Sequence, residues 1–418
     1  MNRIDYFRGL VEESYNNKDY NKAKEICELL FREQYSISPI KNLGTADDLY
    51  NLAVICEKLD DHAKAVEYYT ASLRLIFSIE GLSRRYAERL RTLAVLLGEI
   101  GKQDVSLRIH FQYMDLVKEL YGGRSIEYID SLTNAANAAI DSNLEHIALG
   151  LLEKANPLIK KYGTPSEHVT NLLSLSNIFV RDESKESAIK FAEDALEVAE
   201  RHLSREEMAS ISFYLAGLHE SYNDYNDAME MYDLSIDLIT QAVGPEHSAY
   251  VIMLFRKANF LVNIESYEES LILFSEILDL YQRKYGKFHV FYTKCLRAMS
   301  SVYTSLGDKE KAEETLIETI KIKRWIGDDV FLDLVYIVRF YLKENRLDDA
   351  KDMLIYSLIC ANAQDSTFDV MLETMAENFS DLGDSGEHIL ADTIVMLENL
   401  PSLDEVTKKW MEWELTVM

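Results

Sequence analysis

The chain is poor in residues that make turns, with 16 glycines and 5 prolines in 418 residues. This scarcity leaves little turn chemistry for an all-β protein. Ala, Leu, Glu, Lys and Met, which favour helices, are abundant instead. The composition therefore predicts an all-α protein. The length exceeds one ordinary globular core, so several domains or a repeat array are expected.

Basic residues are scarce relative to acidic ones, 44 against 71, and the net charge is −27. Such a charge repels phosphate backbones and anionic lipids, so nucleic acids and membranes are disfavoured as partners. No apolar run approaches the ~20 residues that span a bilayer, and the N-terminal stretch MNRIDYFRGLVEES has no signal-peptide core. We therefore expect a cytoplasmic protein. The acidity alone names no partner, because it also serves solubility.

The four cysteines are far apart and lack the C-x-x-C spacing of zinc and redox sites. They lie on the apolar faces of predicted helices, so we expect buried free thiols in a reducing compartment. They are Cys27, Cys56, Cys295 and Cys360.

The sequence also lacks the common catalytic and ligand-binding motifs. There is no G-x-G-x-x-G, no G-K-[ST] and no calcium loop, and His219-Glu220 begins H-E-x-x-H but is completed by Asn223 instead of histidine. Acidic pairs such as Asp47-Asp48 are expected at helix starts or turns, where they complement the helix dipole. We therefore predict no enzymatic activity, no cofactor and no metal; nothing supports a paired-carboxylate hydrolase.

Small residues recur along the chain at separations of 38 to 42 residues. Each lies in the middle of a segment with helical periodicity, and only a repeat array explains so regular a series. The series is Ala23, Ala65, Ser106, Ala148, Ala188, Ala228, Ser270, Ala312 and Ala350, followed by a degenerate unit near His388.

Residues 295–327 show one repeat most clearly. An apolar stripe at helical spacing ends at Gly307-Asp308, and a second stripe follows. So short a break predicts two antiparallel helices, with Ser300 and Ala312 where they approach most closely. The first stripe comprises Leu296, Met299, Ser300, Tyr303 and Leu306, and the second Ala312, Leu316, Ile320 and Trp325.

This pattern of small and large residues resembles the tetratricopeptide repeat, whose usual unit has about 34 residues. The longer period here, with helix pairs that end in Tyr-Gly-x-x-His, is similar to the kinesin light chain type. The clearest matches are Leu52, Ala53, Ala65 and Tyr69, and Leu215, Ala216, Tyr225, Ala228 and Tyr232.

The resemblance implies a right-handed α-solenoid of about ten antiparallel helix pairs. It covers residues 1–400 as a single array, although Lys257 stands where a large apolar residue is usual. Residues 401–418 contain Val406, Trp410 and Trp413 at helical spacing, so we expect a C-terminal capping helix.

A glycine followed shortly by a histidine marks the joints between repeats, as in YGKFH at 285–289 and VGPEH at 243–247. Equivalent positions in adjacent helix pairs lie about 10 Å apart, so His247 and His289 cannot share a metal ion. We expect each glycine to end a helix in the left-handed conformation and the histidine to belong to the following turn. The glycines are Gly81, Gly122, Gly163, Gly244, Gly286 and Gly327.

The resemblance also implies a ligand groove lined by the first helix of each pair. In the family, the residue after the small residue of that helix points into the groove, and here it is Asn in three repeats. An asparagine amide donates and accepts, so it can pair with a peptide backbone, although Asn on a solvated face can also be merely tolerated. The candidate peptide-binding residues are Asn137, Asn177, Asn259, Arg91, Leu173, Phe213, Phe255, Lys294 and Arg297.

We therefore predict a non-enzymatic scaffold or adaptor that binds a protein or an extended peptide in this groove. An acidic or carboxylate group of the ligand would meet Lys294 and Arg297. The alternative is a peptide-sensing regulatory subunit that controls a separate effector protein. The sequence names neither the partner nor the oligomeric state.

Overall fold

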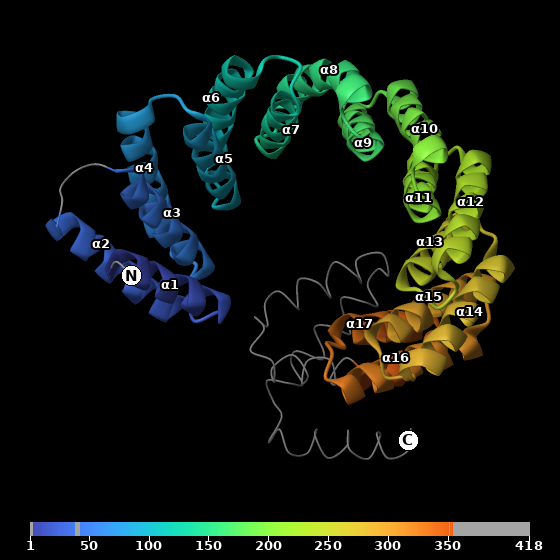
Figure 1. Cartoon of the computed structure of the whole chain (residues 1–418). Coiled ribbons are helices and arrows are strands. Elements are labelled where there is room, and N and C mark those ends of the chain that lie inside the picture. Colours follow the sequence, from blue (N-terminus) through green and yellow to red (C-terminus); the bar gives the residue numbers. More distant parts are fainter. Residues whose placement is uncertain (1–2, 38–41, 351, 354–418) are drawn as a thin grey trace, which may run out of the picture. The chain divides into compact units, whose positions relative to one another are not determined.

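The computed structural model describes residues 3–37, 42–350 and 352–353, and every regular element in them is an α-helix (Figure 1). The predicted all-α class is therefore confirmed. The chain folds as two compact units, Met1–Tyr222 (unit 1) and Asn223–Met418 (unit 2), which are described separately. The prediction of one continuous array over residues 1–400 stays a prediction, and the last repeats and the capping helix lie outside the described residues.

Within the described residues, unit 1 has five helix pairs followed by one further helix. They are α1 (Arg3–Asn16), α2 (Tyr20–Ile37), α3 (Leu43–Lys58), α4 (His62–Glu80), α5 (Arg84–Glu99), α6 (Gln103–Tyr121), α7 (Ile126–Asp141), α8 (Glu145–Tyr162), α9 (Pro165–Arg181), α10 (Lys185–His202) and α11 (Arg205–Ser221).

Six helices of unit 2 lie wholly within the described residues, and a further helical segment begins at Leu347. The six are α12 (Tyr225–Val243), α13 (Ser248–Asn263), α14 (Tyr267–Tyr285), α15 (Val290–Leu306), α16 (Lys309–Ile326) and α17 (Phe331–Lys343).

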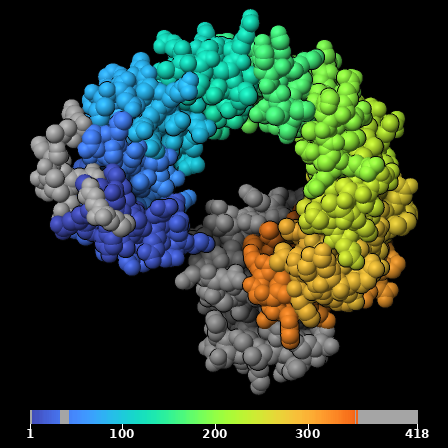
Figure 2. Space-filling model, in the orientation of Figure 1, coloured from blue at the N-terminus to red at the C-terminus, as the bar shows by residue number. Residues whose placement is uncertain are grey.

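Within each unit, every helix packs against its neighbours in sequence, which is the arrangement of an α-solenoid. Figure 1 shows the odd-numbered helices α3 to α9 along one side of unit 1 and the even-numbered helices along the other. In the space-filling view, consecutive helix pairs of unit 1 are in direct contact (Figure 2). We call the side formed by the odd-numbered helices the odd-helix face of each unit.

The small residues that define the repeat lie at the helix contacts, as predicted. All nine, from Ala23 to Ala350, are almost completely buried. A serine at this contact can also link the paired helices. Ser106 Oγ donates to the carbonyl of Ala94 at 2.7 Å. From the facing position on the first helix of a pair, Ser176 Oγ donates to the carbonyl of Ala188 at 2.7 Å, and Ser300 Oγ to that of Ala312 at 2.9 Å. The hydroxyl thus satisfies its own hydrogen-bonding need at a contact too close for a larger side chain.

One left-handed residue recurs in the short turn inside each helix pair, with φ between 54° and 79°. Its separations follow the same 38 to 42 residues as the buried small residues, so the turn repeats with the helices. Most of these positions are not glycine, which the sequence pattern did not reveal. They are Lys18, Asp60, Gly101, Asn143, Glu183, Asn223, Glu265, Gly307 and Asn345.

The six glycines at the joints each follow the last residue of an even-numbered helix, as expected, but their conformation differs from the prediction. Only Gly327 is left-handed helical. Gly286 combines φ 78° with ψ 177°, a region essentially restricted to glycine, and Gly81, Gly122 and Gly244 are similar. Gly163 has φ −86°, so it needs no special freedom. The extended ψ carries the chain away from the helix and into the next pair.

Two residues of the predicted apolar stripes are exposed. Leu296, Met299, Leu316 and Ile320 are buried, but Leu306 is 41% exposed and Trp325 is 73% exposed. Both residues lie in the last turn of their helix, where the neighbouring helix no longer covers the stripe. The Trp325 ring instead lies 5.4 Å from that of Phe288, at the joint before α15.

Replacing Ala312 with leucine is expected to lower the free energy of unfolding by about 1 to 3 kcal/mol, because the added atoms overpack a closed helix contact. Chemical denaturation measures the change. Glu314→Leu is the matched control on an exposed site of α16 and is expected to cost no more than about 0.5 kcal/mol. Equal effects of the two leucines would contradict close packing at Ala312.

Candidate functional site

The predicted groove residues of unit 1 lie on four consecutive odd-numbered helices, α5, α7, α9 and α11. Arg91, Asn137 and Asn177 are exposed, and Leu173 and Phe213 are half-buried. Polar side chains are therefore available beside partly covered apolar ones on the odd-helix face. This is the arrangement that a peptide-binding surface needs.

Asn177 has a partner on the next odd-numbered helix that the sequence pattern did not reveal. The hydroxyl of Tyr214 on α11 lies 2.8 Å from Asn177 Oδ1 and donates to it, and it lies 3.0 Å from Ser176 Oγ. Burial raises the pKa of Tyr214, so the phenol stays protonated and keeps this role. Tyr214 fixes the amide orientation, and the Nδ2 group of Asn177 forms no hydrogen bond with another described residue.

Asn137 on α7 forms no side-chain hydrogen bond among the described residues, so its whole amide is available. Asp130 lies two turns earlier on the same helix. Burial, followed by the charge of Glu167, raises the pKa of Asp130, whereas the Arg91 guanidinium acts in the opposite direction. Charged groups of α5, α7 and α9 therefore influence one another on the odd-helix face.

In unit 2, Phe255 belongs to an aromatic cluster, with ring centroids 5.1 Å from Phe291 and 5.7 Å from Phe274. Asn259 is half-buried, and its Nδ2 donates to the Phe255 carbonyl of its own helix at 2.7 Å. Its Oδ1 and the second N–H of its Nδ2 group are therefore what remains for a ligand. Asn259 offers less to a peptide backbone than Asn137 does.

Lys294 is exposed on α15, but Arg297 already has a partner. Arg297 lies 3.7 Å from a carboxylate oxygen of Asp333, and its guanidinium is 6.0 Å from the centre of the Tyr336 ring. Asp333 is fully buried and also forms an ion pair with Lys323 at 2.7 Å. The charge of Arg297 is therefore shared between this buried carboxylate and the surface.

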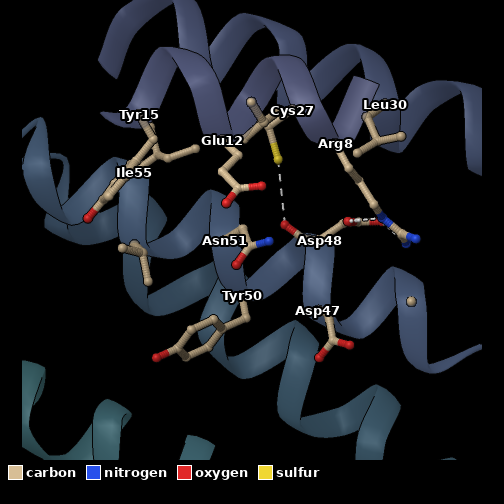
Figure 3. A pocket seen from close by; sticks show the side chains of 13 residues that line it. Arg8, Glu12, Tyr15, Cys27, Leu30, Asp47, Asp48, Tyr50, Asn51 and Ile55 are labelled. Carbon is tan, nitrogen blue, oxygen red and sulfur yellow. Dashed lines mark hydrogen bonds and ion pairs between the residues drawn. The ribbon is translucent and has the colours of Figure 1, made fainter. Parts of the chain in front are cut away.

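A cleft between α1, α2 and α3 is a feature that the sequence did not predict (Figure 3). Its volume is about 680 Å³. Glu12 from α1 and Asn51 from α3 point toward one another across it, and Cys27 from α2 lines it (Figure 3). Burial raises the pKa of the Cys27 thiol to about 12, so it stays protonated, and its Sγ donates to the Asp48 carbonyl.

Asp48 corrects an expectation about the acidic pairs. It is buried in the second turn of α3, where both carboxylate oxygens accept hydrogen bonds from Arg8, at 3.0 and 2.9 Å. Its neighbour Asp47 forms ion pairs with Arg85 and Arg89 of α5. The two aspartates therefore link α3 to helices of the adjacent repeats. The sequence pattern predicted only that they complement the helix dipole.

The histidines of the joints act in capping. His247 Nδ1 accepts from the backbone N–H of Ala249 at 3.3 Å, and His289 Nδ1 accepts from that of Phe291 at 3.0 Å. Each is the N-cap of the following helix, α13 or α15. The expected place in the turn is confirmed. The joint between α8 and α9 differs, because the N-cap there is Thr164, which forms a capping box with Glu167.

Three buried cysteines, Cys27, Cys56 and Cys295, are free thiols as expected, and Cys360 lies outside the described residues. None of the helices described is both long and apolar enough to cross a bilayer.

Two segments match family models described as tetratricopeptide repeat, residues 49–78 and 249–324. No curated protein matches the sequence. A similar solved structure is the apo form of RapI, with 11% identity over 86% of this chain and 98% of that chain and a TM-score of 0.53.

Two further similar structures cover about half of the chain. The putative kinesin light chain TPR-like repeats of Podosopora anserina have 14% identity, cover 50% of this chain and 99% of that chain, and give a TM-score of 0.44. BtubC (BKLC) from P. vanneervenii has 13% identity, 58% and 92% coverage and a TM-score of 0.43.

Two segments of the chain therefore contain tetratricopeptide repeats, and the helix pairs of the described residues form an all-α solenoid. Its odd-numbered helices from α3 to α17 begin 39 to 43 residues apart, which is the predicted long repeat. Solenoids of this class are generally protein-interaction scaffolds.

Proposed function

We propose that this protein is a non-enzymatic scaffold that binds an extended peptide or protein segment on its odd-helix face. The observation that carries the proposal is the placement of Asn137 and Asn177 at the same position of consecutive odd-numbered helices, α7 and α9. Both side chains are exposed. Asn177 is also oriented by Tyr214, which reduces the entropy lost when a ligand binds.

The repeat spacing suits an extended ligand. Adjacent helix pairs are displaced by about 10 Å, and an extended chain rises about 3.3 Å per residue. One repeat therefore spans about three residues of a peptide, so amides on consecutive repeats can pair with backbone groups three residues apart. Leu173 and Phe213 lie on α9 and α11 of the same face, where they can bury apolar side chains of the ligand.

The test starts from a peptide selected by the full chain out of a random phage-displayed library. In the variant with Asn137, Asn177 and Asn259 all replaced by alanine, binding of that peptide is expected to weaken by about 0.5 to 1.5 kcal/mol for each hydrogen bond lost. Isothermal titration calorimetry measures the change.

The matched control is Asn226→Ala, which removes an exposed amide from the even-numbered helix α12. It is expected to leave the affinity unchanged. Unchanged affinity of the triple variant, or an equal loss in the control, would overturn the role of the three asparagines.

A further inference from the structure

Acidic residues are almost excluded from the odd-numbered helices of unit 2. Helices α13 and α15 contain none, and α17 contains one, Asp333, which is fully buried. The even-numbered helices α12, α14 and α16 carry four acidic residues each. In a chain with a net charge of −27, one face of this unit therefore presents basic side chains and no exposed carboxylate from its own helices.

The basic residues of these three helices number six. They are Arg256, Lys257, Lys294, Arg297, Arg339 and Lys343, of which Lys257 forms an ion pair with Asp233 of α12.

Large apolar side chains are exposed on the same helices. Ile252 on α13 is 50% exposed, and Leu332 and Tyr336 on α17 are 45% and 44% exposed. Lys294 and Arg297 are three residues apart on α15, which places them on one side of that helix. Arg297 lies over the Tyr336 ring, so the basic side chains of α15 adjoin the apolar ones of α17.

Unit 1 differs in this respect. Its odd-numbered helices carry exposed acids, among them Glu88 on α5 and Asp130 on α7. The odd-helix face of unit 1 therefore carries charges of both signs, since Arg91 is exposed there too, whereas that of unit 2 has no exposed carboxylate from its own helices. An acidic ligand is attracted more strongly to the face of unit 2, which is a source of specificity as well as of affinity.

We propose that the odd-helix face of unit 2 docks an acidic segment of a partner protein, in which acidic side chains alternate with apolar ones. The proposal rests on the scaffold function above and names the chemistry of its partner. The acidic side chains would meet Lys294 and Arg297, and the apolar ones would cover Ile252, Leu332 and Tyr336. An anionic nucleic acid fits less well, because it offers no apolar side chains and is repelled by the whole chain.

The test compares two fluorescent peptides, each acetylated and amidated at its ends. One alternates glutamate with leucine, and the other replaces each glutamate by glutamine, which keeps the shape and removes the charge. Binding to the full chain is measured by fluorescence anisotropy at low and physiological salt. The glutamate peptide is expected to bind more tightly, with a preference that decreases as salt screens the charges.

Lys294→Glu is the informative variant, because Lys294 is exposed and forms no hydrogen bond or ion pair with another described residue. It is expected to weaken the glutamate peptide about three- to tenfold and the glutamine peptide less than about twofold. Lys190→Glu makes the same charge change on the even-numbered helix α10 and is expected to affect neither peptide. Circular dichroism confirms that both variants fold.

Equal affinity for the two peptides, or equal effects of Lys294→Glu and Lys190→Glu, would overturn the acidic partner, as would no binding of either peptide. A library that yields tight ligands without acidic residues would also overturn it while leaving the scaffold function intact. A library that yields no ligand at all would instead count against the scaffold function. Binding of a second copy of the chain, seen as a dimer in ultracentrifugation that Lys294→Glu dissolves, would replace the proposed occupant.

Discussion

Replacing Asp333 with alanine is expected to lower the free energy of unfolding around α15 to α17 by about 3 to 5 kcal/mol. Asp333 is completely buried between Lys323 of α16 and Arg297 of α15. Neither of its carboxylate oxygens accepts a hydrogen bond of good geometry, so the two ion pairs are what offsets the cost of burying its charge. Alanine would leave Lys323, which is 14% exposed, close to an empty site without its main counter-ion.

Native-state hydrogen exchange is the suitable measurement, because a solenoid responds to a local defect near its position and need not unfold in one step. The matched control is Asp328→Ala. Asp328 lies 3.9 Å from the same Lys323 but is partly exposed, so its removal is expected to cost less than about 1 kcal/mol. If the two variants lose the same protection, the buried ion pairs do not stabilise these helices.

Replacing Phe260 with alanine is expected to cost about 3 to 5 kcal/mol, because it removes a fully buried ring and leaves a cavity. Phe260 on α13 packs against two tyrosines of α12, with ring centroids 5.3 Å from Tyr232 and 6.2 Å from Tyr225. It therefore joins the end of one repeat to the start of the next. Denaturation followed by circular dichroism, together with exchange rates in α12 and α13, measures the loss.

Two controls test whether the loss comes from emptying the buried site of Phe260 or from removing any apolar side chain of α13. Phe260→Leu keeps most of the volume and is expected to cost less than about 1.5 kcal/mol. Ile252→Ala removes an apolar side chain from the exposed side of the same helix and is expected to change stability by about 0.5 kcal/mol or less. A small effect of Phe260→Ala, close to that of Ile252→Ala, would show that the two repeats do not depend on this ring.

Local periodicity predicted the positions of the helices and the contacts between paired helices. The alanine and serine series was enough, because a contact between two paired helices tolerates only a small side chain wherever it recurs. The histidines of the joints were placed correctly for a related reason. A cap depends on the two or three residues that follow it, and these are visible in the sequence.

Where the predictions differ from the structure, a neighbouring helix usually determines the exposure or the backbone conformation of the residue. Trp325 shares helical spacing with Ala312 and Ile320, yet it is exposed because its turn lies beyond the reach of the next helix. Gly286, Gly81, Gly122 and Gly244 adopt an extended ψ in place of the predicted left-handed helical one, because the chain must leave the helix in a direction set by the next pair. Asn259 is an exception: it looks equivalent to Asn137, yet its amide donates to the carbonyl of Phe255 on its own helix.

By itself, the sequence determined the all-α class, the tetratricopeptide repeat and its long period, since each depends on spacing within about one repeat. Only the tertiary structure decided which charged side chains pair within the protein and which remain exposed. Arg297 and Asp333 are 36 residues apart, as Arg8 and Asp48 are 40 apart, and both pairs form because stacking of the repeats brings those side chains together. Burial and charge at a surface are properties of several packed helices, and no single stretch of sequence contains them.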